Sequence, residues 1–227
     1  MTYLLHGAAG SRDDWGELIP LLGITEASSI DLYSNEESSL DEFAASLNEM
    51  SSEGDVLIGY SMGGRLALHT LLGRDCKWSR VVIISAHPGL NDPADRIRRV
   101  RADQRWAQLM VDDWAEFVDQ WMEQPVFGGR ENPWSRALPI APARKIQRCF
   151  TCWSLGNQRD LLGQLAKVEI PVLWISGEED RKYSDIAKAA VSRIAAAQLA
   201  IIPGAGHRCP WDKPELTADV IRGFLSP

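Results

Sequence analysis

Short apolar runs alternate with amphipathic runs along most of this 227-residue chain, and the alternation limits the folds it can adopt. Six runs have the length and composition of buried strands: residues 2–5, 28–32, 56–60, 80–85, 171–175 and 198–202. Five segments have the spacing of helices: residues 14–22, 40–50, 62–72, 184–196 and 214–225. Apolar strands separated by helices are typical of a parallel sheet that is covered on both faces. The pattern therefore predicts a doubly wound α/β fold with right-handed crossovers.

The alternation stops between about residues 88 and 164. That stretch is rich in Arg, Trp and Gln with helical spacing, and it contains no convincing strand. A mass of 25.2 kDa suits one domain with an insertion. We predict a core formed by residues 1–87 and 165–227, with residues 88–164 inserted as a helical cap.

Composition narrows the classes of partner. Hydrophobic residues make up 45% of the chain and charged residues 24%, an ordinary balance for a globular protein. The net charge of −7 argues against nucleic acid as a partner. It also means that an anionic small-molecule substrate would need arginines concentrated at its site. The oligomeric state is not indicated.

The opening residues, MTYLLHG, show no basic segment followed by a long apolar one, so we expect no signal peptide. No run approaches the ~18 apolar residues that would cross a bilayer, so no membrane association is expected. The four cysteines are too few for a disulfide scaffold, which favours the cytoplasm. Cys149 and Cys152 form C-x-x-C without a second pair, and we interpret them as one apolar helix face.

Residues 58–65 read IGYSMGGR and contain the pattern G-x-S-x-G, with Ser61 at its centre. The serine follows an apolar strand pattern and precedes a helical one, which is the context that a nucleophile elbow requires. Gly59 and Gly63 suit a turn too tight for side chains. The alternative is a glycine-rich turn whose serine only caps the helix. Position and context predict an exposed hydroxyl at the end of a strand.

A serine hydroxyl needs a histidine to take its proton, and the chain has four. His207 lies in PGAGHRCPW, a glycine-rich loop just after the last predicted strand. His69 falls inside a helical pattern, where a packed or solvated role is expected, and His6 and His87 follow other strands. His207 is therefore the predicted base.

The histidine in turn needs a carboxylate that fixes its tautomer. The strand PVLWISG is followed by EED, and we choose Asp180 there, which gives the chain order Ser, Asp, His. Glu178 and Glu179 are interpreted as solvated, although the spacing leaves Glu179 open. Asp185 and Asp160 are weaker candidates.

Backbone amides that stabilise developing negative charge would complete the site. The segment LLHGAAG places a histidine–glycine turn directly after the first predicted strand. The N–H groups of Ala8 and Met62 are the expected donors, and His6 is expected to brace the loop.

The sequence resembles the α/β-hydrolase fold over essentially its whole length. More narrowly, it is similar to the 2-succinyl-6-hydroxy-2,4-cyclohexadiene-1-carboxylate synthases of menaquinone biosynthesis. The segments that carry this resemblance are GYSMGGR, SAHPGLNDPADRIRRVRADQRW, DQWMEQPVF, SGEEDRKY and PGAGH. The elbow and triad are shared by the whole superfamily. HPGL with its arginine-rich helix, followed by WxxQPVF, is much more specific.

The resemblance implies a lyase and not a hydrolase. Members of that family eliminate pyruvate from an anionic cyclohexene intermediate, and their triad starts the reaction by abstracting a proton. Carried over to this chain, the triad is Ser61, Asp180 and His207. The resemblance further implies that Arg65 and Arg99 bind substrate carboxylates, that Tyr60 and Trp121 line the pocket, and that Ala8 and Met62 donate backbone hydrogen bonds.

Arginines suit such a substrate because the guanidinium group pairs with a carboxylate through two hydrogen bonds. The start of the cap offers five arginines: Arg96, Arg98, Arg99, Arg101 and Arg105. Arg96 and Arg99 share one helix side, so Arg96 is a further candidate. We expect at least half of the five arginines to lie on a solvated, charged face of the helix.

Three departures from the family are visible. After the second predicted strand the chain reads YSNEESS, where superfamily members usually have a Gly-His-Gly turn. The strands that normally precede the histidine–glycine loop are absent, which predicts a sheet trimmed at its N-terminal edge. The later cap offers Arg130, Arg136 and Arg144 for one further substrate contact, and the sequence does not choose among them.

Two other functions are compatible with the triad. A carboxylesterase or thioesterase would use Ser61 as an acyl nucleophile. A binding or sensor protein would keep the fold without turnover, which the retention of all three triad residues argues against. No metal is expected because the His, Cys and carboxylate residues lack ligand spacing, and no cofactor is expected because no glycine-rich phosphate loop is present.

Overall fold

The structure is a computed structural model that describes residues 1–34, 36–37, 39–130 and 143–226. Its centre is a six-stranded, fully parallel sheet with the strand order β2-β1-β3-β4-β5-β6. The strands are β1 (Thr2–Leu5), β2 (Ala27–Ile30), β3 (Val56–Tyr60), β4 (Arg80–Ile84), β5 (Val172–Gly177) and β6 (Ala197–Ile202). The α/β architecture predicted from the alternation of apolar runs is confirmed, and the strand ends differ by at most two residues.

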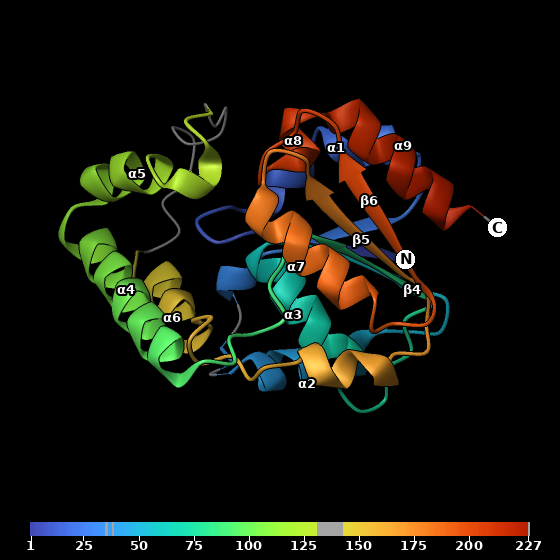
Figure 1. The fold of residues 1–227 in the computed structure, drawn as a ribbon, viewed down its shortest axis with the longest axis horizontal. Helices are drawn as coiled ribbons and strands as arrows, with labels where there is room; N and C mark the ends of the chain where they lie inside the picture. The colour runs from blue at the N-terminus through green and yellow to red at the C-terminus, as the bar shows by residue number, and fades with distance from the viewer. Residues whose placement is uncertain (35, 38, 131–142, 227) are drawn as a thin grey trace.

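Helices cover both faces of the sheet, as Figure 1 shows. The core helices are α1 (Leu18–Leu22), α2 (Leu40–Met50), α3 (Met62–Leu71), α7 (Arg181–Val191), α8 (Cys209–Asp212) and α9 (Pro214–Leu225). Helices α1 and α9 pack on one face through an apolar cluster that includes Leu18, Leu22 and Phe224. Helices α2, α3 and α7 contribute to the cluster on the other face. The apolar strands are thus buried on both sides, which their sequences require.

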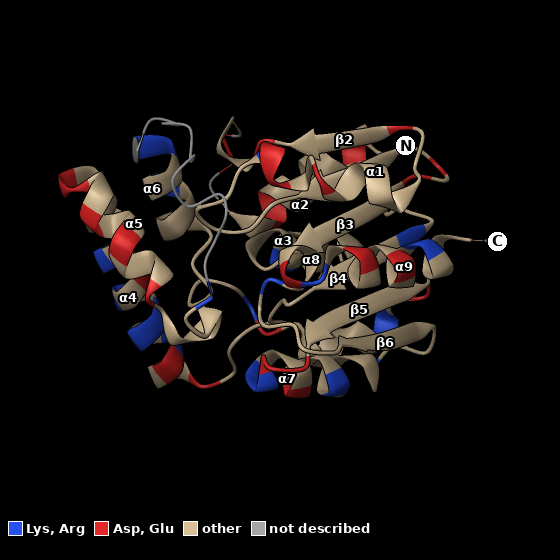
Figure 2. Cartoon of the chain, turned by 90° about the horizontal axis from the view of Figure 1, so that it is seen from above, with Lys and Arg blue, Asp and Glu red and all other residues tan. Residues whose placement is uncertain are grey.

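The segment between β4 and β5 is helical. It contains α4 (Pro93–Asp112), α5 (Trp114–Met122), α6 (Ala143–Cys152) and the short 3₁₀ helices η3 (Pro125–Phe127) and η4 (Leu162–Lys167). Figure 2 shows α4, α5 and α6 beyond the carboxyl ends of the strands. Side chains of these three helices join the apolar cluster of α2 and α3, so the cap is packed against the core. The exact limits predicted for the cap and the core stay predictions.

Two predicted helices are wrong in their extent. The helix predicted over residues 184–196 is α7, which begins at Arg181 and ends at Val191. Residues 14–22 form two pieces, the 3₁₀ helix η1 (Arg12–Trp15) and then α1. The physical reason is Pro20, because a proline deep in a continuous helix would lose a backbone hydrogen bond and clash with the preceding turn. In the observed arrangement Pro20 lies in the first turn of α1, where it is tolerated. A box formed by Ser11 and Asp14 caps η1.

None of the helices in the described part of the chain is both long and apolar enough to cross a membrane.

Candidate active site

Ser61 occupies a strained turn between β3 and α3. Its φ of 50° lies in the left-handed region that non-glycine residues rarely adopt. A Cβ atom on Gly63 would collide with the carbonyl oxygen of Leu5, and one on Gly59 would lie 2.5 Å from the carbonyl oxygen of Gly63. Only glycine therefore fits at both positions of the turn. The backbone at Ser61 thus forms the tight strand-to-helix turn that the G-x-S-x-G pattern predicts.

Three side chains form a continuous hydrogen-bonded relay at the carboxyl ends of the strands. Ser61 Oγ lies 3.2 Å from His207 Nε2, and His207 Nδ1 lies 2.6 Å from Asp180 Oδ2. His207 and Asp180 are both buried, with side chains 4% and 6% exposed. Buried in this way, the carboxylate fixes Nδ1 as the protonated nitrogen and leaves Nε2 free to accept the serine proton. The arrangement can therefore activate the Ser61 hydroxyl.

The other carboxylates that the sequence offered are engaged elsewhere. Glu178 Oε2 accepts a hydrogen bond from the Gly204 amide at 3.0 Å, and Glu179 pairs with Arg130. Asp185 pairs with Lys188, and Asp160 accepts from the amide of Leu162. Of the five candidates, Asp180 alone reaches His207.

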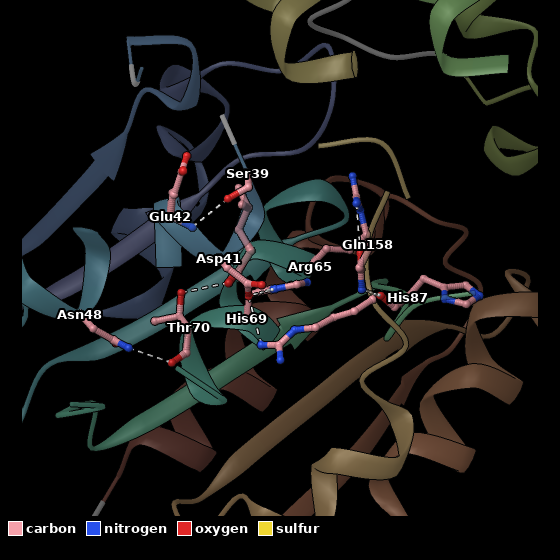
Figure 3. Close-up of polar contacts among 11 residues, drawn as sticks. Ser39, Asp41, Glu42, Asn48, Arg65, His69, Thr70, His87 and Gln158 are labelled. Atoms are coloured by element: carbon pink, nitrogen blue, oxygen red, sulfur yellow. Dashed lines mark hydrogen bonds and ion pairs between the residues drawn. The ribbon is translucent and has the colours of Figure 1, made fainter. Parts of the chain in front are cut away.

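The remaining histidines have other surroundings. His6 is fully buried, donates from Nδ1 to the Gly7 carbonyl at 2.8 Å and accepts at Nε2 from the Leu32 amide at 3.1 Å. Burial lowers the pKa of His6 to about 4, so the ring is neutral and braces its loop. His69 lies 2.7 Å from Asp41 on α2, far along α3 from Ser61 (Figure 3).

The two residues whose backbone amides are expected to stabilise negative charge both lie at the cavity that contains Ser61. Ala8 and Met62 line the same cavity as Ser61. Met62 begins α3, so its N–H has no acceptor within the helix. Within the described residues, neither N–H group donates to a protein acceptor. Both are therefore free to donate to a bound ligand.

The relay opens into a cavity of about 540 Å³ between the core and the cap. Cationic side chains on its walls are Arg65, Arg99, Arg130, Lys182 and Arg208. This concentration of positive charge occurs in a protein whose net charge is −7. The cavity is therefore suited to an anionic small molecule.

Arg65 lies one turn along α3 from Ser61 and is 7% exposed. Its Nη1 donates to Gln158 Oε1 at 3.1 Å and its Nη2 to the Trp153 carbonyl at 2.8 Å, so it connects α3 to the cap (Figure 3). Burial and the neighbouring positive charge of Arg99 lower the pKa of Arg65 to about 10. The guanidinium stays charged at neutral pH without a carboxylate partner.

Arg99 of α4 also lines the cavity, and Asp103 orients it. Arg99 Nε lies 2.9 Å from both carboxylate oxygens of Asp103, one helical turn away. Asp103 is buried and accepts a second hydrogen bond from Ser154 Oγ at 2.7 Å. Arg99 lines the cavity, and among the described residues its Nη groups form no hydrogen bond.

The other arginines behave differently. Arg96 does not line the cavity, because its Nε donates to the carbonyl of Gly156 at 3.0 Å, and we leave it out of the site proposed below. Arg130 lines the cavity but pairs with Glu179 and, at 3.5 Å, with Asp212. Arg144 is exposed and away from the cavity, and Arg136 lies outside the described residues.

Both aromatic residues expected in the pocket line it. Tyr60 has its ring centroid 5.7 Å from that of His207. Trp121 of α5 packs at 5.3 Å against Trp106 and at 5.1 Å against Phe150. The apolar part of the cavity is thus shared between the core and the cap.

Three further residues at the site were missed by sequence reasoning. Tyr183 packs against His207 with the two rings tilted and their centroids 4.5 Å apart, Gln158 accepts a hydrogen bond from Arg65, and Arg208 follows His207 directly. Tyr183 had a local signal, because it lies three residues after Asp180, in the first turn of α7, but the predicted helix began only at residue 184. Gln158 gave no local signal, since its role depends on a contact between residues 93 positions apart.

No group of three or more His, Cys, Asp or Glu side chains among the described residues is arranged to hold a metal ion. All four cysteines are free thiols.

The sheet, the elbow and the relay define a class of protein. Residues 3–220 match the model of the α/β hydrolase family, so the chain belongs to that family and is an enzyme of its fold. A structure of an esterase from Exiguobacterium antarcticum has a TM-score of 0.74 at 17% identity and covers 99% of this chain and 91% of its own. That similarity concerns the fold alone.

More specific relatives are 2-succinyl-6-hydroxy-2,4-cyclohexadiene-1-carboxylate synthases. The one from Klebsiella pneumoniae is 30% identical over 92% of this chain and 87% of its own length. The one from Serratia proteamaculans is 28% identical over 97% and 91%. The structure of MenH from S. aureus has a TM-score of 0.89 at 22% identity and covers 99% and 92%. The chain belongs to this synthase family, and the resemblance seen in its motifs is confirmed.

Proposed function

We propose that this enzyme eliminates pyruvate from an anionic cyclohexene carboxylate intermediate and so takes part in menaquinone biosynthesis. The observation that carries the proposal is the combination of an activated serine with arginines in one cavity of a synthase-family chain. An ester hydrolase for neutral substrates would have no use for guanidinium groups on its walls. A substrate with several carboxylates needs them.

The chemistry follows from the relay. Ser61 Oγ takes a proton from a substrate carbon while its own proton passes to His207 Nε2, and Asp180 stabilises the imidazolium that forms. The electron pair of the broken C–H bond forms a C=C bond. The adjacent C–O bond breaks, and its electrons leave with the enolate of pyruvate. That enolate then recovers the proton held by His207, so atoms and charge balance.

Two groups of residues support this step. The amides of Ala8 and Met62 are free to stabilise negative charge that develops on a substrate oxygen. Arg65 and Arg99 would hold carboxylates, while Tyr60 and Trp121 cover the ring. A cytoplasmic location, favoured by the cysteine content, stays a prediction, as does the absence of nucleic-acid and membrane partners.

The test is release of pyruvate, measured with lactate dehydrogenase and NADH, when the purified protein is mixed with the menaquinone-pathway intermediate. We expect turnover by the wild type and a loss of about 10²–10⁴-fold in Ser61→Ala, since proton transfer by a positioned group contributes that much. No pyruvate above background from the wild type would contradict the proposal.

A second candidate is a carboxylesterase or thioesterase, and the Ser61–His207 geometry is the observation that favours it. Turnover of nitrophenyl esters with an acyl group trapped on Ser61, seen by mass spectrometry, would support it. Under the lyase proposal no stable acyl group forms.

A further inference from the structure

Arg208 is a buried cation on the cavity wall that the proposed mechanism does not yet use. It directly follows His207, precedes the short helix α8 and is 8% exposed. It lines the same cavity as Ser61. A guanidinium group in this place is either a structural tether or part of the binding site, and its surroundings distinguish the two.

The contacts of Arg208 orient its side chain without neutralising it. Cζ lies 3.8 Å over the ring of Phe127, and Nη2 lies 3.3 Å from Met122 Sδ. A thioether is a weak acceptor. Nη1 is shielded from solvent and has no hydrogen-bond partner among the described residues. No carboxylate of the described chain comes within 4.0 Å to form an ion pair with it.

The two carboxylates whose charge raises the pKa of Arg208, those of Asp212 and Asp14, form hydrogen bonds with other groups. Asp212 accepts from the Gly206 amide at 2.7 Å and pairs with Arg130 at 3.5 Å. Asp14 accepts from the amide and the hydroxyl of Ser11. Burial lowers the pKa of Arg208, and Tyr60 and Asp212 offset only part of that effect. A buried charge without a counter-ion is costly, so its retention calls for a partner that the free protein does not supply.

The chemistry of the proposed reaction provides such a partner. The name of the relatives' product contains a succinyl group and a ring carboxylate, and pyruvate carries a third carboxylate. Arg65 and Arg99 form one positive group, since the charge of Arg99 lowers the pKa of Arg65. Arg208 contacts Met122 and Phe127, which are separate from the partners of Arg65 and Arg99.

We propose that Arg208 binds a substrate carboxylate at the α5–η3 wall of the cavity, separately from the one held by Arg65 and Arg99. This inference rests on the proposed function for the identity of the substrate. The flat guanidinium is suited to the role, because one face stacks on Phe127 while its edge can pair with a carboxylate.

The test compares Arg208→Met, Arg208→Lys and the control Arg193→Met in the pyruvate assay. Methionine keeps the packing against Phe127 and removes the charge. We expect kcat/KM to fall about 10- to 100-fold in Arg208→Met, mainly through KM, because a hydrogen bond to a charged group is lost. Lysine should restore part of the loss. Arg193 is exposed and does not line the cavity, so its variant should match the wild type.

A purely structural role predicts a different result. If Arg208 only tethers the cap, Arg208→Met should lower the melting temperature. If it awaits a ligand, removal of an unpaired buried charge should leave the melting temperature of the free protein unchanged or raise it. Wild-type KM in Arg208→Met, or a KM effect that follows a loss of folded protein, would overturn the inference.

Equilibrium binding separates this inference from the proposed function. Succinate, which carries the terminal carboxylate of the succinyl side chain of the proposed product, is titrated by calorimetry into Ser61→Ala with and without Arg208→Met. Weaker binding in the double variant supports a carboxylate site at Arg208 even if the wild type releases no pyruvate. Equal binding in both, together with an unchanged KM, contradicts it.

Discussion

The relay and the arginines of the cavity are built in different ways. Each relay residue follows the carboxyl end of one strand: Ser61 follows β3, Asp180 follows β5 and His207 lies in the loop after β6. Their positions are fixed by the sheet itself. The cap arginines depend on which side of the 20-residue helix α4 faces the core. The ends of the strands thus fix the positions of the relay residues. Which arginines reach the substrate depends on how α4 is rotated about its own axis.

The largest effect is expected from breaking the relay at its buried end. Asp180→Asn keeps the shape of the side chain but allows the wrong tautomer of His207, so kcat/KM should fall about 10³–10⁴-fold. The matched control is Glu178→Gln, two residues earlier, whose carboxylate is exposed and bonded to the Gly204 amide. Equal activity of both variants would show that Asp180 has no part in the reaction.

Two glycine substitutions compare how well the turn after β3 and the cap tolerate an added Cβ atom. Gly63→Ala places a Cβ against the Leu5 backbone and should lower the free energy of unfolding by ~3 kcal/mol. Gly128→Ala in the cap, where φ is 61° and nothing lies within 4 Å, should cost only ~1 kcal/mol. Urea denaturation measures both. Similar costs would mean that the elbow yields as easily as the cap loop.

These contrasts explain what could be predicted from the sequence. Parallel strands place their carboxyl ends at one edge, so a motif, a carboxylate and a histidine after three strands could be joined without knowing any distance. The same reasoning could not tell which of Arg96 and Arg99 lines the cavity. They share a helix side, and the difference between them depends on Gly156 and Asp103, which are tertiary contacts. Arg208 was not predicted, because the sequence of the loop before the short helix α8 gives no sign that this side chain is buried.

Two histidines, the fully buried His6 and the half-buried His87, predict how stability depends on pH. Burial lowers the pKa of both His6 and His87 to about 4, so between about pH 4 and 6.5 the unfolded chain binds more protons than the folded one. Their contribution to stability is full above pH 6.5 and is lost as the pH falls. Asp14, whose pKa burial raises to about 6, acts in the opposite direction. For these three groups the net change is one proton, which corresponds to ~1.4 kcal/mol per pH unit between about pH 4.5 and 6. Burial also lowers the pKa of His69, which acts in the same direction as His6 and His87.

Urea denaturation across that range checks the sign. His87→Gln should remove one of the two histidine contributions and flatten the dependence by ~1.4 kcal/mol per pH unit. A free energy of unfolding that falls as the pH rises from 4.5 to 6 would contradict the assignment of neutral buried histidines.

The role of helix rotation can be tested directly on two neighbouring residues of α4. Arg99→Ala should raise KM about 10- to 100-fold, since a charge-assisted hydrogen bond contributes ~1.5–3 kcal/mol. Arg98→Ala, on the exposed side where the side chain pairs with Asp95, should change KM little, because surface ion pairs contribute ~0–1 kcal/mol.

Arg99→Ala also leaves the buried Asp103 with only its Ser154 bond. The double variant Arg99→Ala/Asp103→Asn removes that orphaned charge and should recover stability. KM should stay high in it, because no guanidinium returns to the cavity. If KM recovers together with stability, Arg99 acts only by supporting the cap, and the cavity cations would no longer distinguish this enzyme from an esterase.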